Sequence, residues 1–370
     1  MPQSAPLHVF YLIRTLAALA LMLAAVVALS PTSKPARFGA DDRTRLDHRS
    51  AVLAKTIGTL TAADNGSFCT AFCVAPDRIA TASHCLFGTA ATPGPRLRAL
   101  RFKLGASSFM DRGAAIAGRG SANQSQRIIS GTRRLAVTPP IGAAGDWAVA
   151  QLERPLCKAN ALPITTKSRA VIVQAAKRGE IYQVAVHADL PGGDLHRDGP
   201  CAVEDQQSNA GFATNSLNFL EPGAIFFHTC DTGGGSSGSP LLIDTNDGPE
   251  VVALNVGTYV RAGSVPTART KPAALQHDGL PIANTAIAVP NLAVAITELS
   301  QESAVLTRAG IRRVHLLLRE RGLYHGEISS RVSDDLIAAI KQFEELQGVP
   351  ARGRLTQKLM TDLQKWQPKQ

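Results

Sequence analysis

The sequence predicts an all-β domain followed by a small all-α domain. Between residues 50 and 290, short apolar runs of β-type composition alternate with Gly, Pro, Asn and Asp turns, which is typical of barrels and sandwiches. After Ser300 the apolar residues recur at helical spacing instead, as at Ile311, Val314 and Leu318. The composition of 31 Gly and 22 Pro in 370 residues fits a turn-rich β protein.

Each predicted strand is a short apolar run bounded by turn residues. The predicted strands are Lys55–Thr61, Ser67–Val74, Arg78–Ala82, Leu100–Leu104, Trp147–Leu152, Ala170–Gln174, Ile181–His187, Ala224–His228, Pro240–Ile243, Val251–Val256 and Thr285–Val289. A helix at Asn291–Leu299 closes this domain, which we expect to span residues 49–300.

Three helices are predicted in residues 306–366, after a linker at 301–305. The first helix ends at Gly322. The second is capped by Ser333, carries Asp334 and Asp335 in its first turn, and buries Leu336, Ile340 and Phe343 before Gly348 stops it. The third is capped by Thr356.

The first thirty residues indicate export. Arg14 precedes an uncharged apolar run, Leu16 to Leu29, that is typical of a secretory signal and short for a membrane span. An uncleaved anchor that extends back to Val9–Ile13 is the alternative, and membrane association is expected only in that case. Residues 31–48 are polar and aperiodic, as expected of a leader or linker. The expected location is the periplasm, the cell envelope or the medium.

The net charge of +10 favours contact with anionic surfaces. Because no run of Lys and Arg exceeds two residues, we expect no nucleic acid as a partner. Six cysteines in an exported chain indicate disulfides, for which sequence alone permits fifteen pairings. Zinc binding by Cys69 and Cys73 is the weaker alternative, since no second close pair of cysteines exists. We expect no metal and no cofactor.

Three local motifs carry candidate chemistry. They are Thr81-Ala82-Ser83-His84-Cys85, Gly145-Asp146-Trp147 at the head of a strand, and Gly235-Ser236-Ser237-Gly238-Ser239-Pro240. A serine hydroxyl needs a neighbouring imidazole to take its proton, and the imidazole needs a carboxylate to fix its tautomer. His84, Asp146 and Ser237 follow in that order at separations of 62 and 91 residues. This order and spacing predict a catalytic triad.

At these motifs the chain resembles the trypsin/chymotrypsin family over residues 49–300. The resemblance implies two six-stranded antiparallel barrels with the site between them. It implies a serine endopeptidase that hydrolyses polypeptides through an acyl-enzyme, with Ser237 as nucleophile, His84 as general base and acid, and Asp146 as its orienting carboxylate. The backbone N–H groups of Gly235 and Ser237 would form the oxyanion hole.

The chain departs from the family pattern beside the nucleophile. Ser236 stands where many members carry the Asp that pairs with a newly freed amine, so activation by a buried N-terminus is not expected. The sequence around it resembles the bacterial branch that includes glutamyl endopeptidases. Asp231 and Thr232 are the expected substrate-binding residues, with Asp231 at the place of the acid that attracts Arg or Lys. A hydrogen-bonded loop acid is the alternative for Asp231.

The same resemblance implies a disulfide between Cys69 and Cys85. Alongside it we expect Cys201–Cys230 near the substrate pocket and Cys73–Cys157 in the first barrel.

Residues 306–366 resemble a three-helix peptidoglycan-binding domain at Val314 to Leu318, Gly322 to Gly326, Ala339 to Phe343 and Gly353 to Thr356. Peptidoglycan is therefore an expected partner. Tyr324 and His325 are candidate ligand contacts, or alternatively packing residues. A generic helical adaptor is the alternative for the domain, and a catalytically silent protease homologue that binds the cell wall is the alternative for the whole chain.

Overall fold

The structure is a computed structural model that describes residues 37–38, 40–46, 51–105, 111–118, 121–137, 142–205, 224–260, 276–277, 280–301 and 307–366. The expected signal or anchor at residues 1–30 lies outside the described residues, and so does all but one residue of the linker expected at 301–305. Within the described ranges, no helix is long and apolar enough to cross a membrane.

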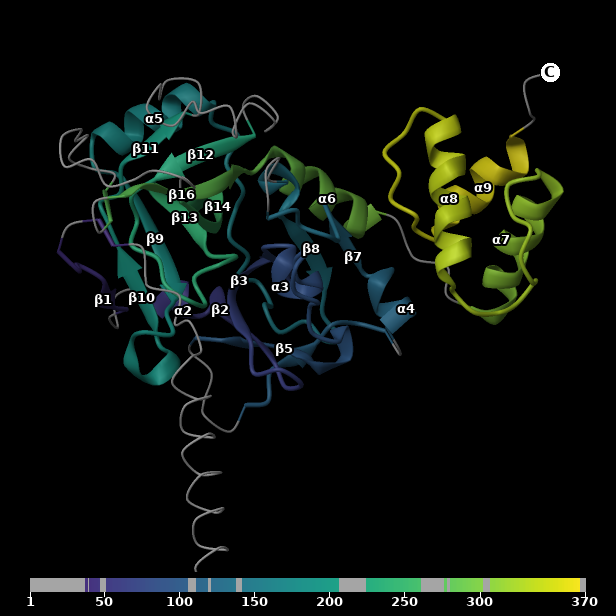
Figure 1. The fold of residues 1–370 in the computed structure, drawn as a ribbon, viewed down its shortest axis with the longest axis horizontal. Helices are drawn as coiled ribbons and strands as arrows, with labels where there is room; N and C mark the ends of the chain where they lie inside the picture. Colours follow the sequence, from purple (N-terminus) through teal and green to yellow (C-terminus); the bar gives the residue numbers. More distant parts are fainter. Residues whose placement is uncertain are drawn as a thin grey trace, which may run out of the picture. The chain divides into compact units, whose positions relative to one another are not determined.

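Among the described residues, the first sheet contains seven antiparallel strands in the order β6-β5-β2-β3-β4-β8-β7. Figure 1 labels five of them, β2, β3, β5, β7 and β8. Its strands are β2 (Ile57–Ala62), β3 (Phe68–Ala75), β4 (Arg78–Thr81), β5 (Leu100–Leu104), β6 (Ala114–Ala115), β7 (Ile128–Ser130) and β8 (Ala148–Gln151). Fully buried side chains such as Phe72 and Ile79 supply its core face.

The second sheet contains nine described strands, in the order β1-β10-β9-β13-β14-β16-β12-β11, with β15 paired to β16. Its strands are β1 (Thr44–Arg45), β9 (Ile181–Val186), β10 (Leu195–Asp198), β11 (Val203–Asp205), β12 (Ile225–His228), β13 (Pro240–Thr245), β14 (Gly248–Val260), β15 (Gln276–His277) and β16 (Leu280–Ala288). Six strands per barrel were expected. The described ranges contain seven strands in the first sheet and nine in the second, and the short strands β1, β6 and β15 account for three of the four additional ones.

The two sheets are curled antiparallel half-barrels that meet through β3. The Thr70 N–H donates to the Ser237 carbonyl at 2.9 Å, and its hydroxyl accepts from the Val186 N–H at 3.0 Å. One hydrophobic core includes buried residues of both sheets, among them Phe72 and Leu254. The segment that carries Ser237 is therefore held at the junction of the two half-barrels.

The described helices connect the strands or follow them. They are α2 (Ala51–Ala54), α3 (His84–Phe87), α4 (Ser121–Ser125), α5 (Arg169–Lys177), α6 (Pro290–Gln301), α7 (Arg308–Glu320), α8 (Asp334–Leu346) and α9 (Gln357–Lys365). Helix α6 confirms the helix predicted at Asn291–Leu299.

The strand predicted at Ala170–Gln174 is wrong, because these residues belong to α5. The β-branched side chains in this run favour a strand by composition. However, the Ser168 side chain accepts a hydrogen bond from the Val171 N–H and caps a helix. Ile172, Ala175 and Ala176 are then buried at helical spacing, while Val171 is 46% exposed.

Part of the segment that we expected to be a leader is folded onto the second sheet. Thr44 and Arg45 form β1, which pairs antiparallel with Arg197 and His196 of β10. The Phe38 N–H donates to Asp231 Oδ1 at 2.7 Å. Within residues 31–48, the described residues 37–38 and 40–46 therefore reach the region next to the candidate site.

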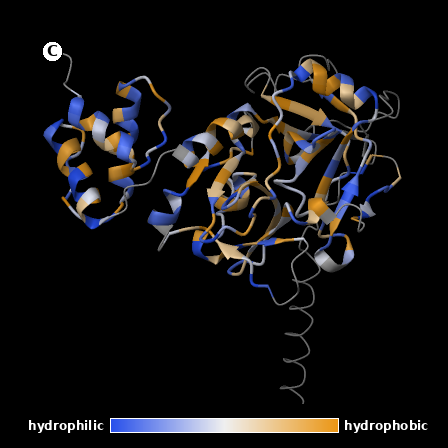
Figure 2. Ribbon diagram, turned by 180° about the vertical axis from the view of Figure 1, so that it is seen from behind, coloured by the Kyte–Doolittle hydropathy of each residue, from blue (hydrophilic) through white to orange (hydrophobic). Residues whose placement is uncertain are grey.

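Helices α7 to α9 share a hydrophobic core of their own. Ser333 and Thr356 cap α8 and α9 as predicted, by accepting hydrogen bonds from Leu336 and Leu359 N–H groups. Figure 2 shows hydrophobic and hydrophilic residues alternating along these helices, as expected of amphipathic helices packed together.

Candidate active site

Two neighbouring strands bring His84 and Asp146 together. His84 begins α3 just after β4, and Asp146 lies just before β8. These strands pair antiparallel, with Thr81 opposite Ala148. The His84 Nδ1 lies 2.7 Å from Asp146 Oδ2, and the His84 backbone N–H donates to Asp146 Oδ1 at 2.9 Å. Since Asp146 is only 1% exposed, both of its oxygens are committed to positioning His84.

The pKa of His84 is raised above its ordinary value. Burial on its own lowers this pKa, but the negative charge of Asp146 and its hydrogen bond to the ring raise it by more. An imidazole with a raised pKa is a stronger base, and a carboxylate partner stabilises the imidazolium that forms when it accepts a proton.

Ser237 lies in the loop between β12 and β13 and is partly exposed. The serines on either side are buried and hydrogen-bonded. Ser236 Oγ donates to the Gly233 carbonyl at 2.8 Å, and Ser239 Oγ accepts from Gln183 Nε2 at 2.5 Å. Of the three serine hydroxyls in this loop, only that of Ser237 is without a hydrogen bond to the described residues.

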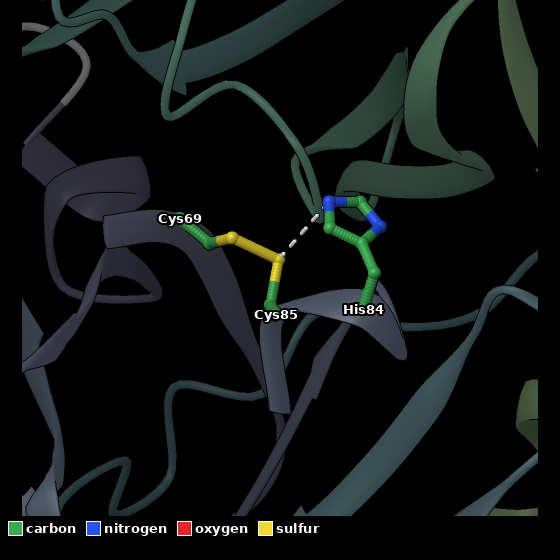
Figure 3. Close-up of side chains that lie close together, drawn as sticks. All are labelled: Cys69, His84 and Cys85. Carbon is green, nitrogen blue, oxygen red and sulfur yellow. Dashed lines mark hydrogen bonds between the residues drawn. A yellow bond between two sulfur atoms is a disulfide. The ribbon is translucent and has the colours of Figure 1, made fainter. Parts of the chain in front are cut away.

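The Cys69–Cys85 disulfide lies between the imidazole and the serine loop. Cys85 Sγ is 3.8 Å from His84 Nε2 (Figure 3). The same sulfur is 3.8 Å from the Ser237 carbonyl oxygen. The described residues include no hydrogen bond between Ser237 Oγ and His84. Catalytic hydrogen bonds are often long before substrate binds and shorten in the substrate complex.

The backbone around Ser237 adopts conformations that favour glycine. Gly235 has φ +93° and Gly238 has φ +83°. A Cβ on Gly235 would lie 2.2 Å from the ring of Phe68. Neither the Gly235 N–H nor the Ser237 N–H donates to a backbone carbonyl of the described residues. Both N–H groups are therefore available to an anionic oxygen.

Two residues that hold this loop were not identified from the sequence. The Thr70 hydroxyl donates to the Gly235 carbonyl at 2.8 Å, in addition to its backbone bond to Ser237. The Asn255 side chain donates to the Ser236 carbonyl at 2.9 Å. Both side chains bind backbone carbonyls. Every residue has a backbone carbonyl, so such contacts leave no motif in the sequence.

The expected substrate-binding residues, Asp231 and Thr232, are buried. Asp231 Oδ1 accepts from the Phe38 N–H, and the Asp231 N–H donates to Asp198 Oδ2 at 2.5 Å. The Thr232 hydroxyl donates to Asn284 Oδ1 at 3.0 Å. These contacts favour the interpretation of Asp231 as a loop residue held by hydrogen bonds over its interpretation as an acid that binds the substrate. A role in a substrate pocket would require Phe38 to release the Asp231 carboxylate.

All six cysteines form disulfides in the pairs that we expected: Cys69–Cys85, Cys73–Cys157 and Cys201–Cys230. Such bonds are typical of oxidising environments. Cys69, His84 and Cys85 lie close enough together to suggest a metal site. Because both sulfurs are shared in a disulfide, they are not thiolate ligands.

Part of the chain is similar to a known protein family. Residues 69–254 match the family described as the trypsin-like peptidase domain. The chain belongs to this family. A solved structure described as Glu endopeptidase in complex with MPD is similar to this trypsin-like chain at 15% sequence identity and a TM-score of 0.43. The match covers 70% of this chain and 97% of that one. No protein with a curated description matches the chain.

In the C-terminal helices, Tyr324 has the packing role that we gave as the alternative. It is buried, its ring lies 4.8 Å from that of His315, and its hydroxyl donates to the Glu327 carbonyl at 2.9 Å. His325 is exposed.

Proposed function

We propose that this trypsin-like chain is an active serine endopeptidase with His84, Asp146 and Ser237 as its catalytic triad. The observation that carries the proposal is that Asp146 holds His84 through two hydrogen bonds, one to the backbone N–H and one to the ring. Ser237 lies nearby and is partly exposed, and the serines beside it are already hydrogen-bonded. This pair can make an imidazole basic and hold its Nδ1 proton in place.

In the proposed mechanism, His84 Nε2 takes the proton of Ser237 as the hydroxyl attacks the scissile carbonyl carbon. The carbonyl oxygen becomes an anion and is bound by the Gly235 and Ser237 N–H groups, each worth about 3–4 kcal/mol of transition-state stabilisation. His84 then passes the proton to the leaving amine, which departs and leaves an acyl-enzyme. Water, activated by the same imidazole, hydrolyses this ester and restores Ser237.

Substitution of the three serines tests the proposal. Ser237→Ala should lower kcat for cleavage of a denatured protein substrate by about 10⁵-fold or more, because it removes the nucleophile. Ser236→Ala and Ser239→Ala are matched controls that remove the neighbouring hydroxyls, and each should keep activity within about tenfold of the parent. Activity that survives Ser237→Ala but is lost in either control would place the nucleophile elsewhere.

We also propose that the chain is exported and that residues 306–366 direct it to the cell wall by binding peptidoglycan. Three disulfides support an oxidising compartment. The proposed substrates are polypeptides. Preference for Arg or Lys at the cleavage site remains a proposal that requires Asp231 to be uncovered.

A further inference from the structure

A groove of about 770 Å³ lies at the junction of the two half-barrels. Its first wall comes from the start of β3 and from β2 and β5, and its second wall comes from the end of β9 and the residues around the start of β10. Val186 and Leu195, which pair across β9 and β10, line it as buried side chains. The two walls meet where Leu195 packs against Gly105, since a Cβ on this glycine would lie 2.3 Å from the leucine side chain.

One row of paired residues crosses the first wall from the loop that carries Ser237. Phe68 of β3 pairs with Thr61 of β2, and Thr61 pairs with Arg101 of β5. All three line the groove. The Phe68 ring lies against Gly235, where an added Cβ would be 2.2 Å from it. Because neighbouring strands are about 4.8 Å apart, Arg101 lies about 10 Å from Phe68, which an extended peptide spans in about three residues.

A second row of paired residues runs beside the first. Thr70 of β3 pairs with Thr59 of β2, and Thr59 pairs with Lys103 of β5. The Thr70 hydroxyl donates to the Gly235 carbonyl at 2.8 Å, so this row also begins at the catalytic loop. Residues two apart in a strand lie on the same face, and Thr59 and Lys103 line the groove together with the first row. Each row therefore leads from the catalytic loop to a cationic residue.

The arginines that line the groove are not neutralised by carboxylates. Arg101 is exposed, and its guanidinium donates to the uncharged carbonyls of Arg98 and Leu100 at 3.0 and 2.8 Å. Arg112 is exposed as well. Within the described ranges, no ion pair joins either guanidinium to a carboxylate. Their positive charges can therefore act on an anionic group in the groove.

The carboxylates that line the groove are already paired. Asp111 Oδ1 lies 3.4 Å from Arg154, and Asp194 Oδ2 lies 3.0 Å from Arg45. Neither of these two arginines lines the groove. The acids are thus balanced from outside the groove, and the cations on its walls favour an anionic ligand.

The groove lies on the side of Ser237 from which the leaving amine departs. In the proposed mechanism His84 Nε2 gives its proton to this amine. Cys85 Sγ is 3.8 Å from the same nitrogen, and Cys85 is bonded to Cys69, the neighbour of Phe68 in β3. The substrate chain that follows the scissile bond would therefore pass the disulfide and reach Phe68, where the first row begins.

We propose that this groove binds the substrate residues that follow the scissile bond and selects Asp or Glu about three residues beyond the one that contacts Phe68. The cations at Arg101, Lys103 and Arg112 would attract such a carboxylate and repel Lys or Arg at the same place. This inference rests on the proposed peptidase function. It concerns the leaving-group side of the substrate, so it is separate from any preference set by Asp231.

Cleavage of a mixture of denatured proteins at low ionic strength tests the proposal. Mass spectrometry of the products should find Asp and Glu enriched, and Lys and Arg depleted, among the residues that follow the cut. Two fluorogenic peptides built on the best-cleaved sequence then differ only in Glu or Lys at the enriched position. The parent should cleave the Glu peptide with about tenfold higher kcat/KM, and the ratio should approach one at about 1 M salt.

Arg101→Glu should reverse this ratio, so that the Lys peptide becomes the better substrate. Arg98→Glu is the matched control, because it makes the same charge change at an exposed side chain that does not line the groove. It should keep the parent's ratio. Since the two peptides are compared within each variant, a general loss of activity cancels in the ratio.

The proposal is overturned if the parent shows no preference for the Glu peptide, or if both variants change the ratio equally. Labelling of the parent by a fluorophosphonate probe separates this failure from a failure of the peptidase function. A chain that is labelled on Ser237 but shows no charge preference would contradict the role of the groove alone. A chain that is neither labelled nor active would contradict both proposals.

Discussion

At the scale of single residues, Ser237 differs from the serines beside it in that its hydroxyl has no hydrogen-bond partner among the described residues. Ser236 and Ser239 use their hydroxyls within the protein. His84 and Asp146 were identified from the sequence because each belongs to a short motif next to a strand. Thr70 and Asn255 were not, because they hold the loop through its main-chain carbonyls. Residues that belong to a motif can be recognised in the sequence, whereas residues that hold the backbone of a loop cannot.

The raised pKa of His84 leads to a prediction about pH. Because a general base acts in its neutral form, kcat/KM should rise with pH through a midpoint above the ordinary imidazole pKa of about 6.5. Asp146→Asn removes the group that raises this pKa, so the midpoint should fall below that of the parent and kcat should drop about 10⁴-fold. Profiles from pH 5 to 9 test this, and a flat parent profile would contradict the role of His84.

Gly235→Ala should lower kcat about 10²-fold or more. The added Cβ would meet the Phe68 ring at 2.2 Å, at a φ of +93° that disfavours alanine, and the N–H that we propose binds the oxyanion would move. Gly248→Ala is the control, because Gly248 also has a positive φ but has open space around its Cβ position. It should lose stability and keep its activity. Equal kcat losses in the two variants would indicate strain alone.

At the scale of elements, apolar runs bounded by turns predicted most of the strands well, and Leu100–Leu104 has the predicted bounds. Very short strands such as β1 and β6 were missed because two residues carry no periodicity. The α5 run was misread because its β-branched residues outweighed the Ser168 cap. Pairing with neighbouring strands formed β1 and β6, whereas the Ser168 cap and the burial of Ile172, Ala175 and Ala176 at helical spacing decided α5.

The disulfides should differ in what they stabilise. Cys73–Cys157 spans 84 residues, so its removal should cost about 4.5 kcal/mol of unfolding free energy, against about 3 kcal/mol for Cys69–Cys85, which spans 16. Cys85 also contacts both His84 and the Ser237 carbonyl. The Cys69→Ala/Cys85→Ala variant should therefore lose more kcat but less stability than Cys73→Ala/Cys157→Ala. Urea unfolding and kcat compare the two pairs, and the opposite order of kcat losses would contradict a role for Cys69–Cys85 in the site.

At the scale of the whole molecule, the chain joins a trypsin-like peptidase domain to helices α7 to α9. The caps of α8 and α9 were predicted because Ser and Thr caps are local signals. The residues that would contact peptidoglycan could not be read from the sequence, because packing residues and contact residues share the same types. Tyr324 shows this, since its ring and its hydroxyl are both occupied inside the helical core.

If these helices bind the cell wall, the full chain should sediment with purified peptidoglycan and a chain that ends at Ser300 should stay in solution. Binding should persist at about 0.3 M salt, where electrostatic attraction of a basic protein is strongly screened. Equal sedimentation of both chains, or release of the full chain at this salt concentration, would contradict specific binding by residues 306–366.

The central claim is that Ser237 is the activated nucleophile, and covalent labelling tests it most directly. A fluorophosphonate probe reacts rapidly only with a serine whose proton is taken by a neighbouring base. Mass spectrometry of the digested, labelled chain should find the adduct on Ser237, with labelling lost in Ser237→Ala and slowed at least a hundredfold in Asp146→Asn. An adduct on another serine, or no labelling of the folded chain, would contradict the account.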